Sequence, residues 1–513
     1  MTDSRPRVLG RAIRTAALLT LLLGPSVRAH ELPRTGLVRP RPVWDGQRLL
    51  RRIDFDQDFE RLVVKFHEGT GARARHGRLT IAWIHGPPLW SRQFWQLRSE
   101  LRLIEQLAAR HGLRPTPLFP QGELRLELWR KRVERAGGVA AADLNLYVTF
   151  ELADLGRRTP VEEIARAIVG FPSVEVVYPE TLTVHAFEET VGPTDIAPPG
   201  ITPFFLGLQG YLQPAPEGVD AFYAWSVPGG AGEGIRVNDV DTGVNEDHED
   251  LPDLFSSDGE GYDPSHGTAA LGIIAARDNG IGLKGIAYAA EVGMELASNM
   301  NSAAVIQTAV MEVSPGDVVL TETAKTLSGW DCPCNPTQAG YVAQEVYPAQ
   351  FDVIQMATLA GVTVVEVGGN GCVDYDDASF EGWFDRDVQD SGAIIVGAGL
   401  STAREPTCYS PYGDRIDLHA WAEDIVCLEF VRPTEDPVYD AGPGRLYGPN
   451  FGGTSGAAAI VAGVVASLQG AYQGKFVFDV DPIPPETARQ ILVTEAAMPF
   501  RVTFYAVRLA RLC

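Results

Sequence analysis

Short apolar runs alternate with helix-like segments over the second half of the chain. From residue 235 onward the β-rich runs are IRVNDV, EVGMEL, DVVLTE, VTVVEV, AIIVGAG and RIDLHAW, and between them stand segments such as HGTAALGIIAA, PAQFDVIQMATLAG and SGAAAIVAGVVASLQGAY. Alternating strands and helices predict an α/β fold with a doubly wound, mostly parallel sheet. In such folds, functional sites collect at the carboxyl ends of the strands.

The first half of the chain predicts a smaller unit of mixed helices and strands. Its elements are expected at 61–66 (strand), at 91–112 and 121–136 (helices), and at 144–152, 159–172 and 174–180 (strand, helix, strand). Ser91 is the expected N-cap of the first helix. Thr159 caps the helix that follows, with Pro160 in its first position. The pattern predicts an α+β unit with its own core, joined to the second half by a Pro/Gly-rich connection at 186–234.

The N-terminus has the pattern of an export signal. Several arginines between Arg5 and Arg14 precede the apolar stretch AALLTLLLG, and small residues follow up to Ala29. Because the apolar stretch is too short to span a bilayer comfortably, we expect a secretory signal peptide that is cleaved after Ala29. A retained membrane anchor is the alternative. No later segment reaches ~18 uninterrupted apolar residues, so the mature protein is expected to be soluble and extracellular.

All six cysteines fall in the last third of the chain: Cys332, Cys334, Cys372, Cys408, Cys427 and Cys513. In an exported protein they are free to form disulfides, and the sequence leaves about fifteen pairings open. The segment Cys332-Pro-Cys334 would also suit a metal, but no second Cys or His pair stands at ligand spacing. Disulfides are therefore the favoured interpretation.

Charge divides the chain into a basic part and an acidic part. Residues 1–190 hold 29 Lys and Arg against 22 Asp and Glu, whereas the remainder holds 14 against 44. A net charge of −23 argues against a nucleic-acid-binding protein. The division predicts either two parts that attract each other or two separately solvated surfaces.

Three polar residues stand where predicted strands end or helices begin. Asp241 follows the run IRVNDV, His266 opens a helix of small residues, and Ser455 lies among glycines in NFGGTSGAAA. Each of them alone is typical of a turn or a helix cap. Together they supply an orienting carboxylate, a base and a nucleophile. Asn370, on the Gly-rich turn of VTVVEVGGNG, could donate its amide to an oxyanion beside the Ser455 N–H.

The order of these residues and their contexts VDTGV, HGTAALG, VVEVGGNG and GGTSGAAAIVAG resemble the subtilisin-like serine peptidases over about 213–475. The resemblance implies a subtilisin-like fold and a secreted serine endopeptidase that hydrolyses peptide bonds through an acyl-enzyme. Asp241, His266 and Ser455 would then be catalytic, and Asn370 would belong to the oxyanion hole.

The chain departs from the family pattern at three positions around these motifs. Ala269 stands where the family has a second His after HGT, and Gly456 and Ala459 replace the Met and Pro after the nucleophile. None of these positions transfers a proton, so activity is expected to survive.

The resemblance also divides the chain into a signal peptide (1–29), a prosegment (30–195) and a peptidase domain (196–513). The strand–helix–strand of 144–180 resembles the family's inhibitory prosegment, which assists folding and is cleaved off. The expected partners are protein or peptide substrates and the chain's own prosegment, and the expected protein is a zymogen that matures to a monomer. Self-cleavage is expected within 181–212.

Two weaker expectations rest on the same resemblance. Glu322-Thr323-Ala324 matches the family's substrate-edge Ser-Leu-Gly, and Glu322 would favour basic residues in the substrate. The segments DHEDLPDL and ARDNGIGLKG resemble a calcium region. Its ligands would be Asp250, Asn279, Gln213 and backbone carbonyls of 277–283, which form the oxygen shell that structural Ca²⁺ prefers. No catalytic cofactor is expected.

Two other interpretations remain open. Pepsin-like proteases use two Asp-Thr/Ser-Gly motifs, and this chain has them at Asp241 and at Asp390. The second motif lacks a preceding apolar strand, and the α/β alternation disagrees with an all-β fold. A scaffolding protein that kept the fold without activity is the non-enzymatic alternative, although a scaffold needs none of the four polar residues together.

Overall fold

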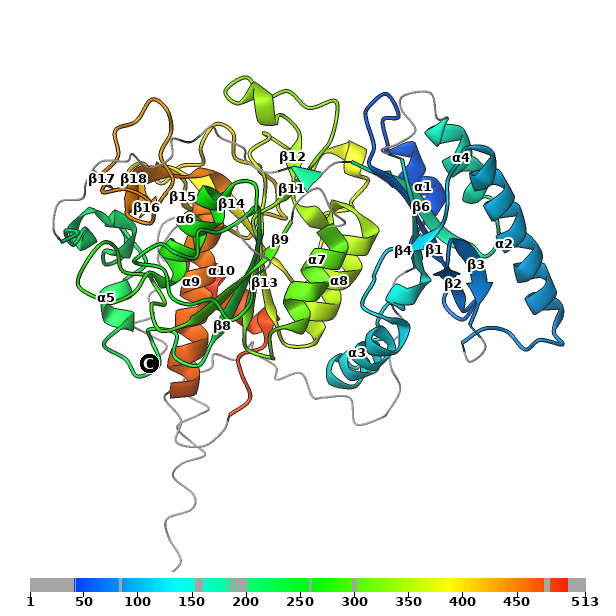
Figure 1. Ribbon diagram of the computed structural model, residues 1–513, viewed down its shortest axis with the longest axis horizontal. Coiled ribbons are helices and arrows are strands. Elements are labelled where there is room, and N and C mark those ends of the chain that lie inside the picture. The colour runs from blue at the N-terminus through cyan, green and yellow to red at the C-terminus, as the bar shows by residue number, and fades with distance from the viewer. Residues whose placement is uncertain are drawn as a thin grey trace, which may run out of the picture.

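The computed structural model of the chain describes residues 41, 43–82, 85–152, 160–181, 183–184, 190, 201–257, 261–297, 302–474 and 480–496. The predicted signal peptide, the helix cap Thr159, the predicted boundary at 195 and Cys513 lie outside these residues. Figure 1 shows a larger C-terminal body around a central sheet and a smaller N-terminal unit beside it.

The central sheet has six parallel strands in the order β15-β14-β13-β10-β8-β9, which confirms the predicted fold class. The strands are β8 (Arg236–Asp241), β9 (Glu291–Leu296), β10 (Val318–Thr321), β13 (Thr363–Val367), β14 (Ile394–Gly399) and β15 (Leu418–Trp421). The chain goes from β8 to β9 on one side and then returns to β10 on the other side of β8. The carboxyl ends of β8 and β10 therefore form a topological switch point, where open α/β sheets bind ligands.

Helices cover both faces of this sheet (Figure 1). On one face lie α6 (Pro264–Ala275) and α9 (Gly453–Gly474), and on the other lie α7 (Ser302–Met311) and α8 (Pro348–Leu359). By length and apolar composition α9 passes as a membrane span, but all of its apolar window is buried in the protein, so it is a core helix. The segment of α7 was not predicted as a helix, because most of its residues are apolar or small and no polar stripe marks its period.

The smaller elements complete the described fold. They are the helices α1 (Gly46–Arg51), α5 (Ala221–Ala224) and α10 (Pro485–Ala496), and two three-stranded antiparallel sets: β7 (Thr183–Val184), β11 (Ala324–Thr326) and β12 (Tyr341–Val342), and β16 (Ile425–Leu428), β17 (Tyr439–Asp440) and β18 (Leu446–Phe451). These short strands carry too few residues for a periodic signal, and the sequence did not predict them.

The N-terminal unit is built on an antiparallel sheet in the order β4-β5-β1-β6. Its elements are β1 (Arg61–Phe66), the hairpin β2 (Ala72–Arg75) and β3 (Arg78–Ile81), α2 (Arg92–Arg110), β4 (Thr116–Pro117), α3 (Glu123–Gly137), β5 (Tyr147–Glu151), α4 (Val161–Ile168) and β6 (Val174–Glu180). Ser91 caps α2, as predicted, by accepting from the Phe94 N–H. Pro160 is the N-cap of α4 and not its first helical residue. The described residues of 60–140 belong to this unit.

Both faces of this sheet are buried, since every residue of β1 and β6 is buried. Leu62 and Val64 face a core formed with α2 and α4, whereas Val63 belongs to a core that it shares with α8. Alternate side chains of a strand point to opposite faces, so one face closes the unit and the other docks it on the C-terminal body.

Candidate active site

Asp241, His266 and Ser455 come together at the end of the central sheet. His266 Nδ1 lies 2.9 and 2.8 Å from the two Asp241 carboxylate oxygens, and His266 Nε2 lies 3.2 Å from Ser455 Oγ. Asp241 is the last residue of β8, His266 lies in the first turn of α6, and Ser455 lies in the first turn of α9. This arrangement can pass the serine proton to an imidazole whose tautomer the carboxylate fixes.

A glycine allows α6 to approach β8 this closely. A Cβ on Gly267 would stand 2.3 Å from the Gly243 carbonyl oxygen and 3.4 Å from Asp241 Cβ. A larger residue would push the first turn of α6, and His266 with it, away from the end of β8. The small residue after the histidine is therefore part of how the site is assembled.

The three side chains are buried, with exposed fractions of 0% for Asp241 and 2% for His266 and Ser455. The rings of Phe451 and His266 meet edge to face with centroids 5.1 Å apart, and Phe430 packs against Phe451 at 5.0 Å. This apolar wall excludes water from the imidazole, which strengthens its hydrogen bond to the carboxylate.

Asn370 lies directly beside the start of α9. Its Oδ1 accepts from the Thr454 N–H at 2.9 Å and from the Thr454 hydroxyl at 3.1 Å. A backbone N–H can only donate, so this bond fixes the amide orientation and leaves Nδ2 on the other side. A Cβ on Gly453 would stand 2.9 Å from that Nδ2, and Gly453 has a φ of +67°, so only glycine fits there.

The first N–H groups of α9 have acceptors with one exception. Gly453 donates to the Ala422 carbonyl, Thr454 donates to Asn370, and Gly456 donates to the Gly452 carbonyl. Among the described residues, no acceptor takes the Ser455 N–H. A free N–H at a helix start beside a serine hydroxyl is a donor for a negatively charged oxygen.

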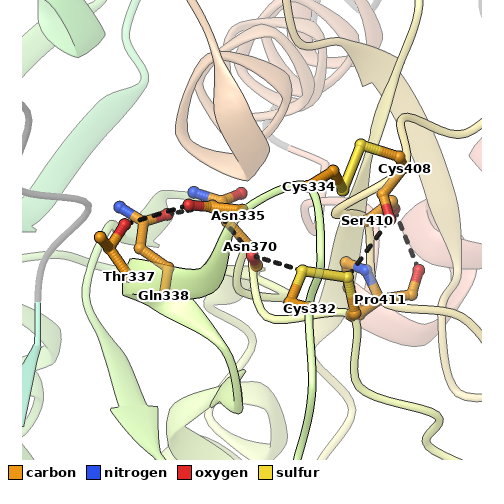
Figure 2. Close-up of a disulfide and its surroundings, with 10 residues drawn as sticks. Cys332, Cys334, Asn335, Thr337, Gln338, Asn370, Cys408, Ser410 and Pro411 are labelled. Atoms are coloured by element: carbon orange, nitrogen blue, oxygen red, sulfur yellow. Dashed lines mark hydrogen bonds between the residues drawn. A yellow bond between two sulfur atoms is a disulfide. The ribbon is translucent and has the colours of Figure 1, made fainter.

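Two disulfides join the loop around residue 333 to the Asn370 region (Figure 2). They are Cys332–Cys372 and Cys334–Cys408, and among the cysteines that the structure describes only the buried Cys427 is free. The sulfurs of Cys332, Cys334 and Cys372 lie close enough to share a metal ion, but they are taken up by these bonds.

The same loop holds the Asn370 backbone. The Asn335 amide donates to the Asn370 carbonyl at 3.1 Å, and Cys332 Sγ lies 3.9 Å from that oxygen (Figure 2). The side chain and the backbone of Asn370 are thus held from two sides, by Thr454 and by the disulfide-linked loop.

Glu322 also lies at the site, and its carboxyl interacts with that of Asp239. Glu322 follows β10 and is 2% exposed, whereas Asp239 lies in β8 and is fully buried. Burial, followed by the charges of Asp239 and Asp241, raises the pKa of Glu322 well above its usual value, and the Ser455 hydroxyl acts in the opposite direction. Asp239 was not predicted as a site residue, although its position two residues before Asp241 on a strand puts both on one face.

The predicted calcium ligands are only partly brought together. Asn279 Nδ2 donates to Asp250 Oδ1 at 3.1 Å, the Leu283 N–H donates to Asp250 Oδ2 at 2.6 Å, and Asn279 Oδ1 accepts from the Ile281 N–H at 3.0 Å. Gln209 bonds to this loop through Lys284, whereas the backbone of Gln213 donates to Gly210 and accepts from Asp220.

The side-chain oxygens of Asp250 and Asn279 do not fit a calcium shell. Ca²⁺ needs six to eight free oxygens, and here the oxygens of Asp250 and Asn279 already accept from N–H groups. Burial also raises the pKa of Asp250 to about 7. Calcium binding stays a prediction, and the arrangement of the side chains argues against it.

The second Asp-Ser-Gly motif lies away from the site. Asp390 pairs with Arg489 at 2.8 Å and precedes β14, whereas Asp241 ends β8. All six strands of the sheet are parallel, so Asp390 lies at the end of the sheet where the strands begin, and Asp241 lies at the end where they finish. A pepsin-like pair of aspartates is not formed.

Comparison with known proteins gives one family match and two structural likenesses. The model of the subtilase family matches residues 232–506. No curated protein matches. Fervidolysin from Fervidobacterium pennivorans, a keratinolytic enzyme related to subtilisin, is 17% identical with a TM-score of 0.50, and the match covers 88% of this chain and 60% of that chain. A cold adapted subtilisin-like serine proteinase is 21% identical with a TM-score of 0.36, over 54% of this chain and 88% of that chain.

The likeness to fervidolysin concerns the fold, and this chain spans about three fifths of the length of that enzyme. The family match concerns the sequence, and it includes the positions of Asp241, His266, Asn370 and Ser455. Because the family model covers more than half of its residues, the chain belongs to the subtilase family of serine-type peptidases.

Proposed function

We propose that the chain is the precursor of a secreted serine endopeptidase that cleaves proteins or peptides through an acyl-enzyme. One observation carries the proposal: the continuous hydrogen-bonded line from Asp241 through His266 to Ser455. An inactive scaffold would not need a carboxylate, an imidazole and a hydroxyl in that order at bonding distance.

The reaction begins when Ser455 Oγ attacks the carbonyl carbon of the scissile bond and His266 Nε2 takes the serine proton. The resulting imidazolium is stabilised by Asp241, which stays ionised. When the tetrahedral intermediate collapses, His266 gives the proton to the leaving amine. Water then attacks the acyl-enzyme by the same route and restores the Ser455 hydroxyl.

The negative charge of the intermediate is met by two donors. The Ser455 N–H has no other acceptor among the described residues, and Asn370 Nδ2 lies across from it at the start of α9. These donors are fixed before the reaction, so they need not reorganise when the charge forms. One such donor contributes roughly 3 kcal/mol, or ~10²-fold in rate.

We further propose that the N-terminal unit is a prosegment that inhibits the peptidase. Its last strand β7 pairs antiparallel with β11, with Thr183 opposite Lys325 and Val184 opposite Ala324. β11 begins two residues after Glu322, which lies at the site. An extended chain added to this edge occupies it as a peptide substrate would.

The chain is next described at Thr190, whose hydroxyl lies 3.4 Å from that of Ser265, the neighbour of His266. Val184 thus lies beside β11, and Thr190 lies beside the first turn of α6. Self-cleavage, expected from the sequence within 181–212, is now expected between these two residues.

Buried polar contacts hold the proposed prosegment in place. Lys325, on the edge strand, pairs with Glu180 at 2.6 Å, and both side chains are fully buried. Tyr147 donates to the Asp352 carboxylate of α8 at 2.7 Å, and Arg48 pairs with Glu381 at the surface. The last pair joins the basic part of the chain to the acidic part, whereas the Lys325–Glu180 pair runs the other way, so charge asymmetry alone does not explain the docking.

Secretion and a monomeric mature enzyme complete the proposal. The disulfides Cys332–Cys372 and Cys334–Cys408 support an oxidising compartment. The signal peptide, outside the described residues, would direct the chain there.

The test compares the wild-type full chain with Ser455→Ala, with Ser467→Ala as the matched control. Ser467 is a buried serine of the same helix that donates to the Ile286 carbonyl, away from the site. We expect the wild type and Ser467→Ala to release a mature N-terminus that begins between Val184 and Thr190. They should also react with a fluorophosphonate probe after release.

Ser455→Ala should stay full-length and unlabelled. Processing of purified Ser455→Ala, or a folded wild type that neither cleaves itself nor reacts with the probe, would contradict the proposal. The second result would favour the scaffold.

A further inference from the structure

Two carboxyl groups that the proposed mechanism does not use lie beside it. In the parallel pairing of β8 and β10, Asp239 is opposite Leu320 and Val240 is opposite Thr321. The Glu322 N–H continues this ladder by donating to the Val240 carbonyl at 3.1 Å. Residues that are opposite each other, or two apart on a strand, share a face, so Asp239, Asp241 and Glu322 lie on one face at the switch point.

Neither extra carboxyl has the partners that a buried anion requires. All four oxygens of Asp239 and Glu322 are buried, and within the described residues none has a hydrogen-bond partner at ordinary distance. An ionised carboxylate left in this state costs several kcal/mol, and a buried carboxyl avoids that cost by keeping its proton.

The charged groups around Asp239 and Glu322 do not stabilise a negative charge on either carboxyl. On the same face, β8 supplies Asp241, α6 supplies His266, and α9 supplies only the Ser455 hydroxyl. Glu295 of β9 is opposite Val240, and Glu366 of β13 is opposite Thr321, so both belong to the other face. Among the described residues, no Lys or Arg contributes to the electrostatics of either carboxyl.

The pKa shifts agree with this geometry. Burial, and then the charge of Asp241, raises the pKa of Asp239 well above its usual value. Burial, and then the charges of Asp239 and Asp241, does the same for Glu322. Asp241 itself receives the Thr242 N–H at 2.6 Å and the His266 Nδ1 proton, so it is the member of the three that carries the charge.

We propose that Glu322 is a positioning residue of the active site, which with Asp239 forms a pair of proton-holding carboxyls and sets the upper pH limit of the reaction. The proposal rests on the proposed peptidase function. A protonated Glu322 carboxyl can donate to Ser455 Oγ, which leaves the serine's own hydrogen directed at His266 Nε2.

Loss of that proton reverses the effect. An ionised Glu322 becomes an acceptor that competes with His266 for the Ser455 hydrogen, and its charge repels the oxyanion that forms on the substrate. Because the protonated form is the active one, activity is full at low pH on this group's account and falls as the pH rises through its pKa. Glu322→Gln keeps the shape and the donor but cannot ionise.

The proposal also changes the expectation for substrate preference. The sequence suggested that Glu322 favours basic residues, which requires an ionised carboxylate. A neutral carboxyl offers no ion pair, so peptides with Arg or Leu before the scissile bond are expected to be cleaved at similar rates.

The experiment compares the processed wild type with Glu322→Gln and Asp239→Asn, and uses Glu366→Gln as the matched control. Glu366 is another fully buried carboxyl with a raised pKa, but it lies on the opposite face. Three quantities are measured from pH 5 to pH 10: kcat/KM for the Arg and Leu peptides, the rate of fluorophosphonate labelling, and the infrared carbonyl band of protonated carboxyls.

We expect the wild type to lose kcat/KM and labelling rate at least tenfold on the alkaline side. Glu322→Gln should keep its rates within about threefold of the wild-type maximum and shift the loss upward by one pH unit or more. Asp239→Asn removes a carboxyl that, once ionised, raises the pKa of Glu322, so the loss should move to lower pH by a smaller amount. The protonated-carboxyl band should persist above pH 7 in the wild type and shrink in Glu322→Gln. The pH profile of the Glu366→Gln control should match that of the wild type.

An alkaline limb that is identical in the wild type and Glu322→Gln would overturn the proposal. So would a strong Arg preference that disappears in Glu322→Gln, since that result requires an ionised Glu322. If the wild type is not labelled at any pH, the peptidase function fails, while the infrared band still reports separately whether Glu322 holds a proton.

Discussion

Replacement of Asn370 by alanine separates two roles of this side chain, the proposed oxyanion donor and the acceptor of the Thr454 N–H. Asn370→Ala removes Nδ2, one of the two proposed donors for the oxyanion, so kcat should fall by about 10² to 10³ (roughly 3 to 4 kcal/mol), while KM stays close to that of the wild type. It also removes the acceptor of the buried Thr454 N–H. An unsatisfied buried donor costs about 1 to 3 kcal/mol of unfolding free energy, and each kcal/mol lowers the melting temperature by roughly 2 to 4 °C.

Asn370→Asp is the matched variant because it keeps the acceptor and removes the donor. The carboxylate still receives the Thr454 N–H, so the melting temperature should return close to the wild-type value. Its charge repels the oxyanion, so kcat should fall at least as far as in Asn370→Ala. The two variants together distinguish lost catalysis from lost stability.

Two assays measure the effect on kcat. The rate of self-cleavage of the full chain is a single turnover that needs no added substrate, and steady-state hydrolysis of a chromogenic peptide gives kcat and KM for the processed enzyme. A fall of less than about fivefold in Asn370→Ala, or an Asn370→Asp enzyme as fast as the wild type, would refute the assignment of Asn370 to the oxyanion hole.

Two further predictions concern the loops around the site. Replacing Cys332 and Cys372 by serine opens a disulfide with a sequence separation of 40 residues and should cost roughly 3 to 4 kcal/mol in the free energy of unfolding. It should also lower kcat by loosening Asn370, whereas opening the Cys334–Cys408 bond should lower stability alone; equal kcat values in the two variants would contradict this. Calorimetry with EGTA and then with calcium should give one melting temperature, because the oxygens of the predicted calcium ligands already accept N–H groups; a calcium-dependent rise would show that this loop rearranges to bind the ion.

Much of the architecture could be predicted because its signals are local. The strands of the central sheet are largely buried runs of mostly apolar residues between turn signals, and α6, α8 and α9 are segments rich in small and apolar residues. The elements that were missed lack a periodic signal. Strands of two to four residues such as β11 and β16 are stabilised by their neighbours, and α7 is buried on nearly all sides.

The site was predicted in part for a related reason. Asp241, His266, Asn370 and Ser455 each follow or open a regular element, so motif context and element boundaries marked them. Asp239 was missed because a strand residue gives no sign of which other carboxyls will share its face. Gln213 was predicted as a calcium ligand, and the structure brings Gln209 to the predicted calcium loop instead.

The sequence by itself determined the order of strands and helices, the residues that could act as base and nucleophile, and the excess of acid in the second half. Only the tertiary structure decided which cysteines pair, which N–H at the start of α9 stays free, and which carboxyls share one buried face. Pairing, burial and the state of a proton depend on distances between segments that lie tens to hundreds of residues apart, and no local pattern of side chains encodes those distances.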